Sequence, residues 1–380
     1  MAALCTALLV GSALPAPHTG ALEPHSASAT VHAKSGGGGG ARALSLAGGV
    51  SLPMLSMNTA DLSAEQVERA IELGLSLGLR SVDFHLGSTE PGAREREGVG
   101  RVIASRGRDA LFLITKLDKP PANMTDPAAA AALARSTLES ELAALGGDGT
   151  VDMLLLKDSS SCAVMRAQWE VLEEALAAGR TRALGTYNFC AFSLDCLLTA
   201  NGGLPAVRTP PAMNFLMRHV GMGPDVNGLI AYGAARGVRT AAYGTLGEPI
   251  ALPELLASPT LQRVGRRHNQ TVESVAVRWN VQAGYAISSR LTADFAPSNT
   301  PTGARCTADC AAALRAMANV HDWALTDADM AALDALRLDQ PPQAPTYYSS
   351  AGCPGGFADA TVDHPTLSAC ANSTSASSWC

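Results

Sequence analysis

Between residues 51 and 338 the chain alternates short apolar runs with longer segments whose apolar residues recur every three or four positions. The first pattern is typical of strands buried on both faces, and the second of helices with one buried face. It predicts strands at residues 81–84, 111–116, 151–156, 182–189, 212–216, 238–243 and 285–289. It predicts helices at residues 64–78, 98–107, 127–145, 167–179, 225–236, 271–284, 313–325 and 326–338.

The alternation of strand and helix decides the fold class. Strands that are apolar along their whole length belong to parallel sheets covered by helices, because both of their faces are buried. Eight such units in this segment match a closed α/β barrel, the (β/α)8 TIM barrel, better than an open doubly wound sheet. Functional side chains in such a barrel stand at the carboxyl ends of the strands, so a site is expected there.

The barrel is expected to be a single domain with flexible extensions at both ends. Residues 1–50 start with a short apolar segment, resemble a leader, and end in a linker with five consecutive glycines, which cannot hold a packed element. Residues 339–380 are rich in Pro, Ser, Gly and Cys and predict an extended tail. The expected barrel therefore covers residues 51–338.

Composition excludes several kinds of partner. The chain has 28 basic and 34 acidic side chains, a net charge of −6, which argues against a nucleic-acid-binding surface. The leader is the one apolar stretch that approaches membrane length, and it is too short to span, so no membrane partner is expected. Cys306 and Cys310 are spaced like metal ligands, but no nearby His or Cys pair completes a tetrahedral site, so no metal is expected. We expect a monomer.

The N-terminus and the cysteines bear on the compartment. Nine cysteines are present, and removal of a leader that contains Cys5 leaves an even number, which permits disulfides. Asn-x-Ser/Thr sequons at Asn123, Asn269 and Asn372 fit a secreted chain, although such triplets also arise by chance. The absence of Lys or Arg before Lys34 weakens both a secretory and a mitochondrial signal. We expect the secretory pathway or an organelle, with the cytoplasm as the alternative.

Several segments, in order and spacing, resemble the aldo-keto reductases, which are barrels that reduce carbonyl compounds with NADPH. They are SLPMLSMNT (51–59), SVDF (81–84), EGVGRVI (97–103), LFLITK (111–116), VDMLLL (151–156), AAGRTRALGTYNF (177–189), AAYGTLG (241–247) and the stretch at 257–284. The resemblance covers residues 51–338. It implies the barrel fold, an oxidoreductase activity and NADP(H) as the cofactor.

The resemblance places the family's active-site Asp and Lys on Asp83 and Lys116. In the family this pair lowers the pKa of a Tyr phenol, which donates a proton as negative charge builds on the carbonyl oxygen. The Tyr should follow the Asp by five positions, where this chain has Ser88, and the first tyrosine of the chain is Tyr187. The His that orients the carbonyl is replaced by Lys157. The tetrad is therefore degenerate, and an alternative interpretation is that Asp83 and Lys116 only neutralise each other in the interior.

The residues expected to hold nicotinamide are partly kept. The family's Ser-Asn pair becomes Tyr187-Asn188, its fifth-strand Gln becomes Phe215, and Tyr243 matches the aromatic residue that stacks on nicotinamide. At the adenosine phosphate, the family's Lys is replaced by Ser288. The Arg and Asn of the next helix are replaced by Ala313 and Met317. Arg290 either supplies one replacement charge or is an ordinary surface residue.

Two substitutes for the missing proton donor remain open. His85 and Lys157 both stand near the barrel mouth, and together they are candidates for an acid and an orienting group. Tyr187 is the other candidate donor. The competing interpretation is that His85 is a satisfied polar group and that Tyr187 fills an emptied nicotinamide slot.

Two functional hypotheses follow. The first is an NADP(H)-dependent oxidoreductase that reduces small aldehydes or ketones by an altered mechanism. The second is a catalytically inactive barrel that acts as a scaffold for a ligand or protein partner. Retention of Asp83, Lys116, Asn188 and Tyr243 favours at least vestigial nucleotide binding, whereas a secretory location favours the second hypothesis.

Overall fold

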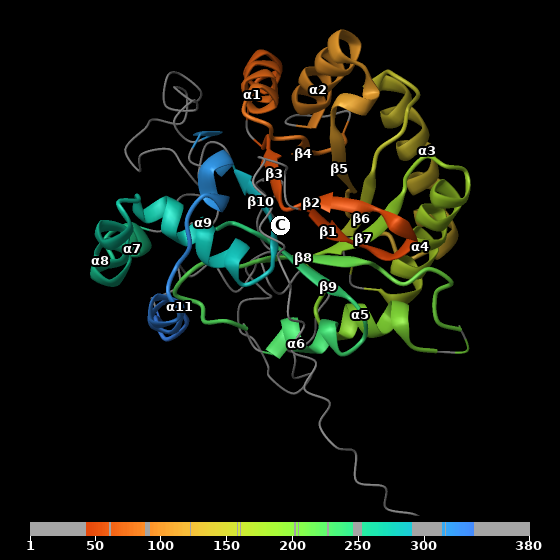
Figure 1. The fold of residues 1–380 in the computed structure, drawn as a ribbon. Helices are drawn as coiled ribbons and strands as arrows, with labels where there is room; N and C mark the ends of the chain where they lie inside the picture. Colours follow the sequence, from red (N-terminus) through yellow and green to blue (C-terminus); the bar gives the residue numbers. More distant parts are fainter. Residues whose placement is uncertain are drawn as a thin grey trace, which may run out of the picture. The chain divides into compact units, whose positions relative to one another are not determined.

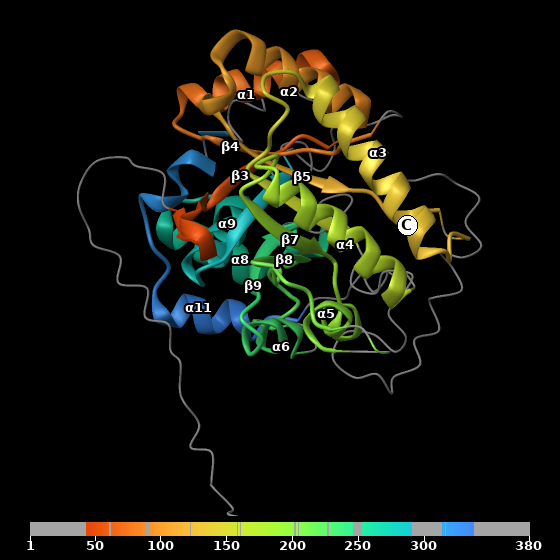
Figure 2. The ribbon, with the colours of Figure 1, turned by 90° about the vertical axis from the view of Figure 1, so that its right-hand side faces the viewer.

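The structure is a computed structural model, drawn as a ribbon in Figures 1 and 2. It describes residues 43–60, 62–87, 92–121, 123–157, 159, 161–200, 203, 205–225, 228–245, 253–290, 314–315 and 317–337. Most of the expected leader and the whole of the expected tail are outside this range, as are Ser88, Cys306, Cys310, Ala313 and the side chain of Arg290. Among the described residues, no helix has the length and apolar content needed to cross a membrane.

Eight parallel strands close into a barrel in the order β10–β3–β4–β5–β6–β7–β8–β9, which confirms the predicted (β/α)8 fold. The strands are β3 (Leu55–Asn58), β4 (Ser81–Asp83), β5 (Phe112–Leu117), β6 (Met153–Lys157), β7 (Ala183–Tyr187), β8 (Met213–Met217), β9 (Arg239–Tyr243) and β10 (Ala286–Arg290). All but β3 coincide with predicted apolar runs. β3 lies in the segment SLPMLSMNT (51–59), the first of those that resemble the family.

The strands are buried on both faces, as their composition predicts. Val82, Leu113 and Leu154 each have 0% exposure, and Val82 lies opposite Leu113 in the parallel pairing of β4 with β5. A sheet with an apolar outer face is stable only when helices cover that face. In Figures 1 and 2 the helices surround the strands on the outside of the barrel.

The helices follow the strands along the chain. They are α1 (Ala64–Ser76), α2 (Gly92–Arg106), α3 (Pro127–Leu145), α4 (Cys162–Ala177), α5 (Ala191–Leu198), α6 (Leu229–Ala234), α7 (Pro253–Leu256), α8 (Pro259–His268), α9 (Val272–Gln282) and α11 (Asp327–Asp334). Short 3-10 helices are η1 (Ala47–Gly49), η2 (Arg108–Ala110) and η4 (Asn319–His321). α1 starts at a capping box in which the Ser63 hydroxyl accepts from Gln66 N and the Gln66 side chain accepts from Ser63 N.

Gly98, the first glycine of the Gly-Val-Gly triplet in EGVGRVI (97–103), has a packing role. A Cβ on Gly98 would lie 2.5 Å from Val67 Cβ and 2.6 Å from the Ala64 carbonyl oxygen, so α2 and α1 approach closely at this residue. The triplet lies inside α2, not at a turn between a strand and a helix. It therefore serves the contact between two helices.

An antiparallel hairpin precedes the barrel. Its strands are β1 (Ala43–Ser45) and β2 (Ser51–Pro53), and Leu44 and Val50 are buried in the main core. Arg239, the first residue of β9, donates to the Ser45 carbonyl oxygen at 2.9 Å, which places the hairpin at the amino ends of the strands. The hairpin thus occupies part of the expected linker (residues 1–50), and its three-residue strand β1 is too short to show a strand's alternation in the sequence.

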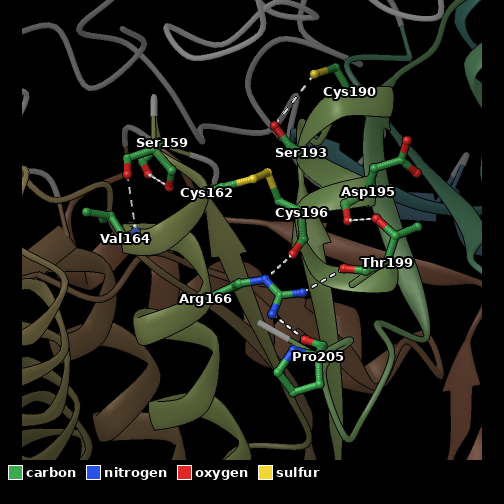
Figure 3. Close-up of a disulfide and its surroundings, with 11 residues drawn as sticks. Ser159, Cys162, Val164, Arg166, Cys190, Ser193, Asp195, Cys196, Thr199 and Pro205 are labelled. Atoms are coloured by element: carbon green, nitrogen blue, oxygen red, sulfur yellow. Dashed lines mark hydrogen bonds between the residues drawn. A yellow bond between two sulfur atoms is a disulfide. The ribbon is translucent and has the colours of Figure 1, made fainter. Parts of the chain in front are cut away.

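A disulfide joins α4 to α5, two helices that flank β7 in sequence. The disulfide joins Cys162 to Cys196, which are 34 positions apart in the sequence (Figure 3). Arg166, one turn after Cys162, donates to the carbonyl oxygens of Cys196 at 2.6 Å, Thr199 at 2.7 Å and Pro205. The end of α5 is therefore fixed to α4 both covalently and by a buried guanidinium.

A second core cluster packs α8, α9 and α11 together. At its edge the buried Asp329 accepts hydrogen bonds from the Thr326 hydroxyl, the His268 ring and Arg267. Burial alone raises the pKa of Asp329, but the Thr326 and His268 hydrogen bonds lower it from 3.8 to about 2. This carboxylate consequently stabilises the fold as long as it is charged.

Candidate functional site

The carboxyl ends of the barrel strands form a rim that carries the predicted site residues. These are Asp83 at the end of β4, Lys116 near the end of β5, Lys157 at the end of β6, Tyr187 at the end of β7, Phe215 within β8 and Tyr243 at the end of β9. In the strand pairing Lys157 lies opposite Tyr187, and Tyr187 lies opposite Phe215. His85 and Asn188 follow β4 and β7 in the rim loops.

Asp83 and Lys116 form a salt bridge that is closed off from solvent. Lys116 Nζ lies 2.5 Å from Asp83 Oδ1, and both side chains are 0% exposed. Asp83 pairs with Ile114 across the parallel strands, so Lys116, two residues further on, points to the same side of the sheet. The structure thus brings these two predicted residues together inside the barrel.

The second oxygen of Asp83 is also engaged. The Ser288 hydroxyl donates to Asp83 Oδ2, Asn58 Nδ2 lies 3.3 Å from the same oxygen, and Asn58 Nδ2 donates to Ser288 Oγ at 3.0 Å. Ser288 is fully buried. β10 thus directs the side chain of Ser288, which the resemblance places at the adenosine phosphate, inward to the ion pair.

Two tyrosine rings stack beside the ion pair. The ring centroids of Tyr187 and Tyr243 are 4.8 Å apart with 20° between the planes, and Tyr243 is 3% exposed. Lys116 Nζ lies over the Tyr187 ring, 5.3 Å from its centroid. The Tyr187 ring thus contacts both the ammonium of the pair and the aromatic residue that the family presents to nicotinamide.

The loop after β7 fixes this arrangement. Asn188 has φ 59, a left-handed conformation that Asn tolerates better than most side chains, and its backbone N–H donates to the Phe215 carbonyl oxygen at 2.9 Å. Its side-chain Oδ1 accepts from the Tyr243 hydroxyl at 2.8 Å. Phe215 is 2% exposed and supplies only apolar surface where the family has an amide.

His85 is paired with a buried acid that the sequence analysis missed. Both oxygens of Glu95, on α2, lie 3.3 Å from His85 Nδ1, and Glu95 Oε2 accepts from His85 N at 3.1 Å and from the Thr59 hydroxyl at 2.9 Å. Burial alone raises the pKa of Glu95, but the His85 ring and the Lys116 ammonium outweigh it and bring this pKa below its ordinary value. A carboxylate at Nδ1 fixes the orientation of the imidazole, so the Nε2 edge of the His85 ring points away from Glu95.

Lys157 has a partner at the outer edge of the rim. Its Nζ lies 2.6 Å from Asp118 Oδ1; the Lys157 side chain is 12% exposed and that of Asp118 is 56% exposed. Burial raises the pKa of Asp118, but the charge of Lys157, followed by His85 and Lys116, brings it below its ordinary value. A lysine held in this way does not reproduce the neutral ring that orients a carbonyl in the family.

Comparison with known proteins identifies the family. The model of the Aldo/keto reductase family matches residues 54–337, most of the chain. The chain belongs to this family. An aldo-keto reductase of Mycolicibacterium smegmatis is 29% identical over 245 residues, which are 63% of this chain and 77% of the relative. Aldo-keto reductase family 1 member A1 of Rattus norvegicus is 28% identical over 257 residues, 62% of this chain and 75% of the relative.

Solved structures agree on the fold. An aldo-keto reductase enzyme from a deep-sea metagenome library has a TM-score of 0.62 at 18% identity, and the match covers 78% of this chain and 94% of that one. An aldo/keto reductase of Brucella melitensis has a TM-score of 0.61 at 21% identity and covers 77% and 97% respectively. At these identities the likeness bears on the barrel alone.

Members of this family generally use NADP(H), and the rim residues of this chain do not fit it as they stand. One face of Tyr243, the residue that matches the family's nicotinamide-stacking aromatic, is covered by the Tyr187 ring. The Asn188 amide oxygen is engaged by the Tyr243 hydroxyl, and Phe215 has no polar group to offer the carboxamide. No reaction step is therefore assigned to a nicotinamide in this barrel.

Sequence reasoning missed Glu95, Asn58 and the inward position of Ser288. For Glu95 a signal existed: Glu95, Val99 and Val102 lie on one helical face, and all three are fully buried. The predicted helix started at residue 98, so Glu95 was left outside it. The Asn58–Ser288 contact joins residues 230 apart in sequence, and only closure of β10 onto β3 brings them together.

Proposed function

We propose that this protein is a degenerate aldo/keto reductase: a barrel that no longer carries out NADP(H)-dependent reduction of small aldehydes or ketones and that serves as a binding scaffold. The observation that carries this proposal is the closed network around Asp83. Its two oxygens are taken by Lys116, Ser288 and Asn58, all inside the barrel. Lys116 bonds the Asp83 carboxylate and lies over the face of the Tyr187 ring.

The chemistry of carbonyl reduction explains why this matters. The oxygen needs an acid within about 2.6–3.2 Å as negative charge develops on it. The sequence has no tyrosine before Tyr187, and a serine hydroxyl is far less acidic than a phenol. With the donor lost, the remaining use of the Asp83–Lys116 pair is to neutralise two charges that the barrel encloses.

The disulfide supports an oxidising compartment. Disulfides persist in the secretory pathway and outside cells and are rare in the cytosol, and Cys162 and Cys196 are bonded. Reduced nicotinamide is scarce in such a compartment, which agrees with loss of the reductase reaction. We extend the proposal accordingly to a monomer of the secretory pathway.

The test is turnover by the purified full-length chain. The protein is mixed with NADPH and a panel of small aldehydes and ketones, and NADPH consumption is followed by its absorbance. We expect no consumption above a control without protein. Consumption that depends on the protein and on the carbonyl compound would contradict the proposal.

The His85–Glu95 pair favours a second candidate function, an NADP(H)-dependent reductase with an altered proton donor. Glu95 holds the His85 ring at the rim, next to the charges of Lys116 and Asp118. If turnover is found, His85→Ala should abolish it. His268→Ala is the matched control, because this histidine lies on α8 and pairs with Asp329 instead of a rim residue. Equal turnover in all three proteins would eliminate this candidate.

A further inference from the structure

Tyr187 and Tyr243 meet because they end alternate strands of the barrel. β8 lies between β7 and β9, and the inward side chains of alternate strands share a layer in a closed barrel. Each tyrosine is the last residue of its strand, so both rings stand at the rim. Their centroid distance of 4.8 Å and interplanar angle of 20° are those of an offset stack.

The Tyr187 ring is held from more than one direction. The Lys116 ammonium lies 5.3 Å from its centroid, over the face of the ring, and Lys116 is 0% exposed. A cation–π contact is strongest when the cation is desolvated in this way. The partner ring is fixed in turn, because the Tyr243 hydroxyl donates to Asn188 at 2.8 Å.

The stack leaves no room for another ring. Carbon atoms of stacked groups approach to about 3.5–4 Å, so a third ring between the two tyrosines would need centroids roughly 7 Å apart. The observed 4.8 Å is the spacing of two rings in contact. A planar ligand therefore reaches this face of Tyr243 only when Tyr187 moves away.

We propose that Tyr187 is a built-in occupant of an aromatic slot on Tyr243, and that this slot takes a planar aromatic amide of the nicotinamide class once Tyr187 is removed. This inference rests on the proposed function, in which the barrel no longer uses the family's cofactor. It adds a specific cause: the slot has not been lost from the fold but is filled by the chain itself. The ring of Tyr187, not its hydroxyl, is the group that fills it.

The test compares binding of NADPH and of reduced nicotinamide mononucleotide to the full-length chain, followed by nicotinamide fluorescence. Tyr187→Ser removes the ring, and Tyr187→Phe is the matched control that keeps the ring and removes the hydroxyl. We expect Tyr187→Ser to bind NADPH at least about tenfold more tightly than the wild type, the equivalent of ~1.4 kcal/mol. Tyr187→Phe should bind like the wild type. The mononucleotide lacks the adenosine end, so it reports on the slot alone.

Three results would overturn the inference. They are wild-type binding as tight as that of Tyr187→Ser, a Tyr187→Phe variant that gains as much as Tyr187→Ser, and a Tyr187→Ser variant that melts cooperatively yet gains affinity for neither ligand. Failure of the proposed function has a different signature. Aldehyde turnover by Tyr187→Ser would show that a proton donor exists, which contradicts the proposed function but not the occupied slot. Tight NADPH binding by the wild type without turnover would contradict the occupied slot but not the loss of catalysis.

Discussion

Replacing Asp83 by Asn tests whether the buried salt bridge is a structural element. Asn has nearly the same shape and still accepts a hydrogen bond, so the main change is loss of the negative charge. Lys116 would then keep its ammonium at 0% exposure without a counter-charge. Breaking a buried pair by removing one partner costs about 3–5 kcal/mol in the free energy of unfolding.

The same reasoning predicts a smaller cost when both charges are removed. In the double variant Asp83→Asn/Lys116→Met no unpaired ion remains, and Met fills most of the volume of the Lys side chain. We expect the double variant to lose less than about half of what Asp83→Asn loses, since the penalty of an isolated buried charge is gone. Asp118→Asn is the matched control: its pair with Lys157 is half-exposed, so its loss should stay below about 1 kcal/mol.

Urea unfolding followed by circular dichroism measures these differences, provided the transition stays two-state. For a domain of this size a loss of ~4 kcal/mol also lowers Tm by roughly 5–8 °C. The reasoning is refuted if Asp83→Asn is no more destabilising than Asp118→Asn, or if the double variant loses as much as the sum of its two single changes.

Further predictions concern the disulfide, the acid stability and the compartment. The double variant Cys162→Ser/Cys196→Ser should lose about 4 kcal/mol of unfolding free energy, the loop-entropy estimate for a sequence separation of 34. The wild type in reducing agent should show the same loss, and an unchanged urea midpoint would contradict the prediction. The pKa of Asp329 is about 2 in the folded state against an ordinary value of 3.8, so its contribution to stability is present above about pH 4 and is lost as pH falls towards 2. Asp329→Asn should flatten the plot of unfolding free energy against pH in that window and leave it parallel to the wild type at higher pH. Asn123 and Asn269 are exposed, so expression in a secretory host should give a gel shift that an endoglycosidase removes. The shift should be smaller in Asn123→Gln/Asn269→Gln, and no shift at all in the wild type would oppose the secretory assignment.

The barrel strands other than β3 were predictable because each is buried on both faces and leaves an apolar run that little else in the sequence imitates. α3 was predicted at Pro127–Leu145, the bounds it has, because Asp126 caps its start and Pro127 follows at the first helical position. α5 was not predicted: it has eight residues, fewer than the pattern needs to show a period, and it is held by the Cys162 disulfide and by Arg166. Its stability comes from contacts distant in sequence, which local pattern does not contain.

The site was predictable in its parts but not in its contacts. Asp83 and Lys116 could be placed because the resemblance to the family assigns them to two strand ends, and strand ends converge in a barrel. The stack of Tyr187 on Tyr243 was only one of two alternatives for Tyr187, since the sequence gives no distance between the ends of β7 and β9. The structure shows the ring on Tyr243, at 4.8 Å. The inward turn of Ser288 was missed because its place was inferred from family spacing, whereas the alternation of side chains along β10 determines where it points.

The most direct measurement is an experimental structure of the full-length wild-type chain in saturating NADPH. The central claim is that the rim keeps a buried Asp83–Lys116 pair and fills the aromatic slot with its own Tyr187. We predict that the Tyr187 ring stays stacked on Tyr243 and that Asp83 still accepts from Lys116 and Ser288. A nicotinamide ring on Tyr243, with Tyr187 displaced, would contradict the account.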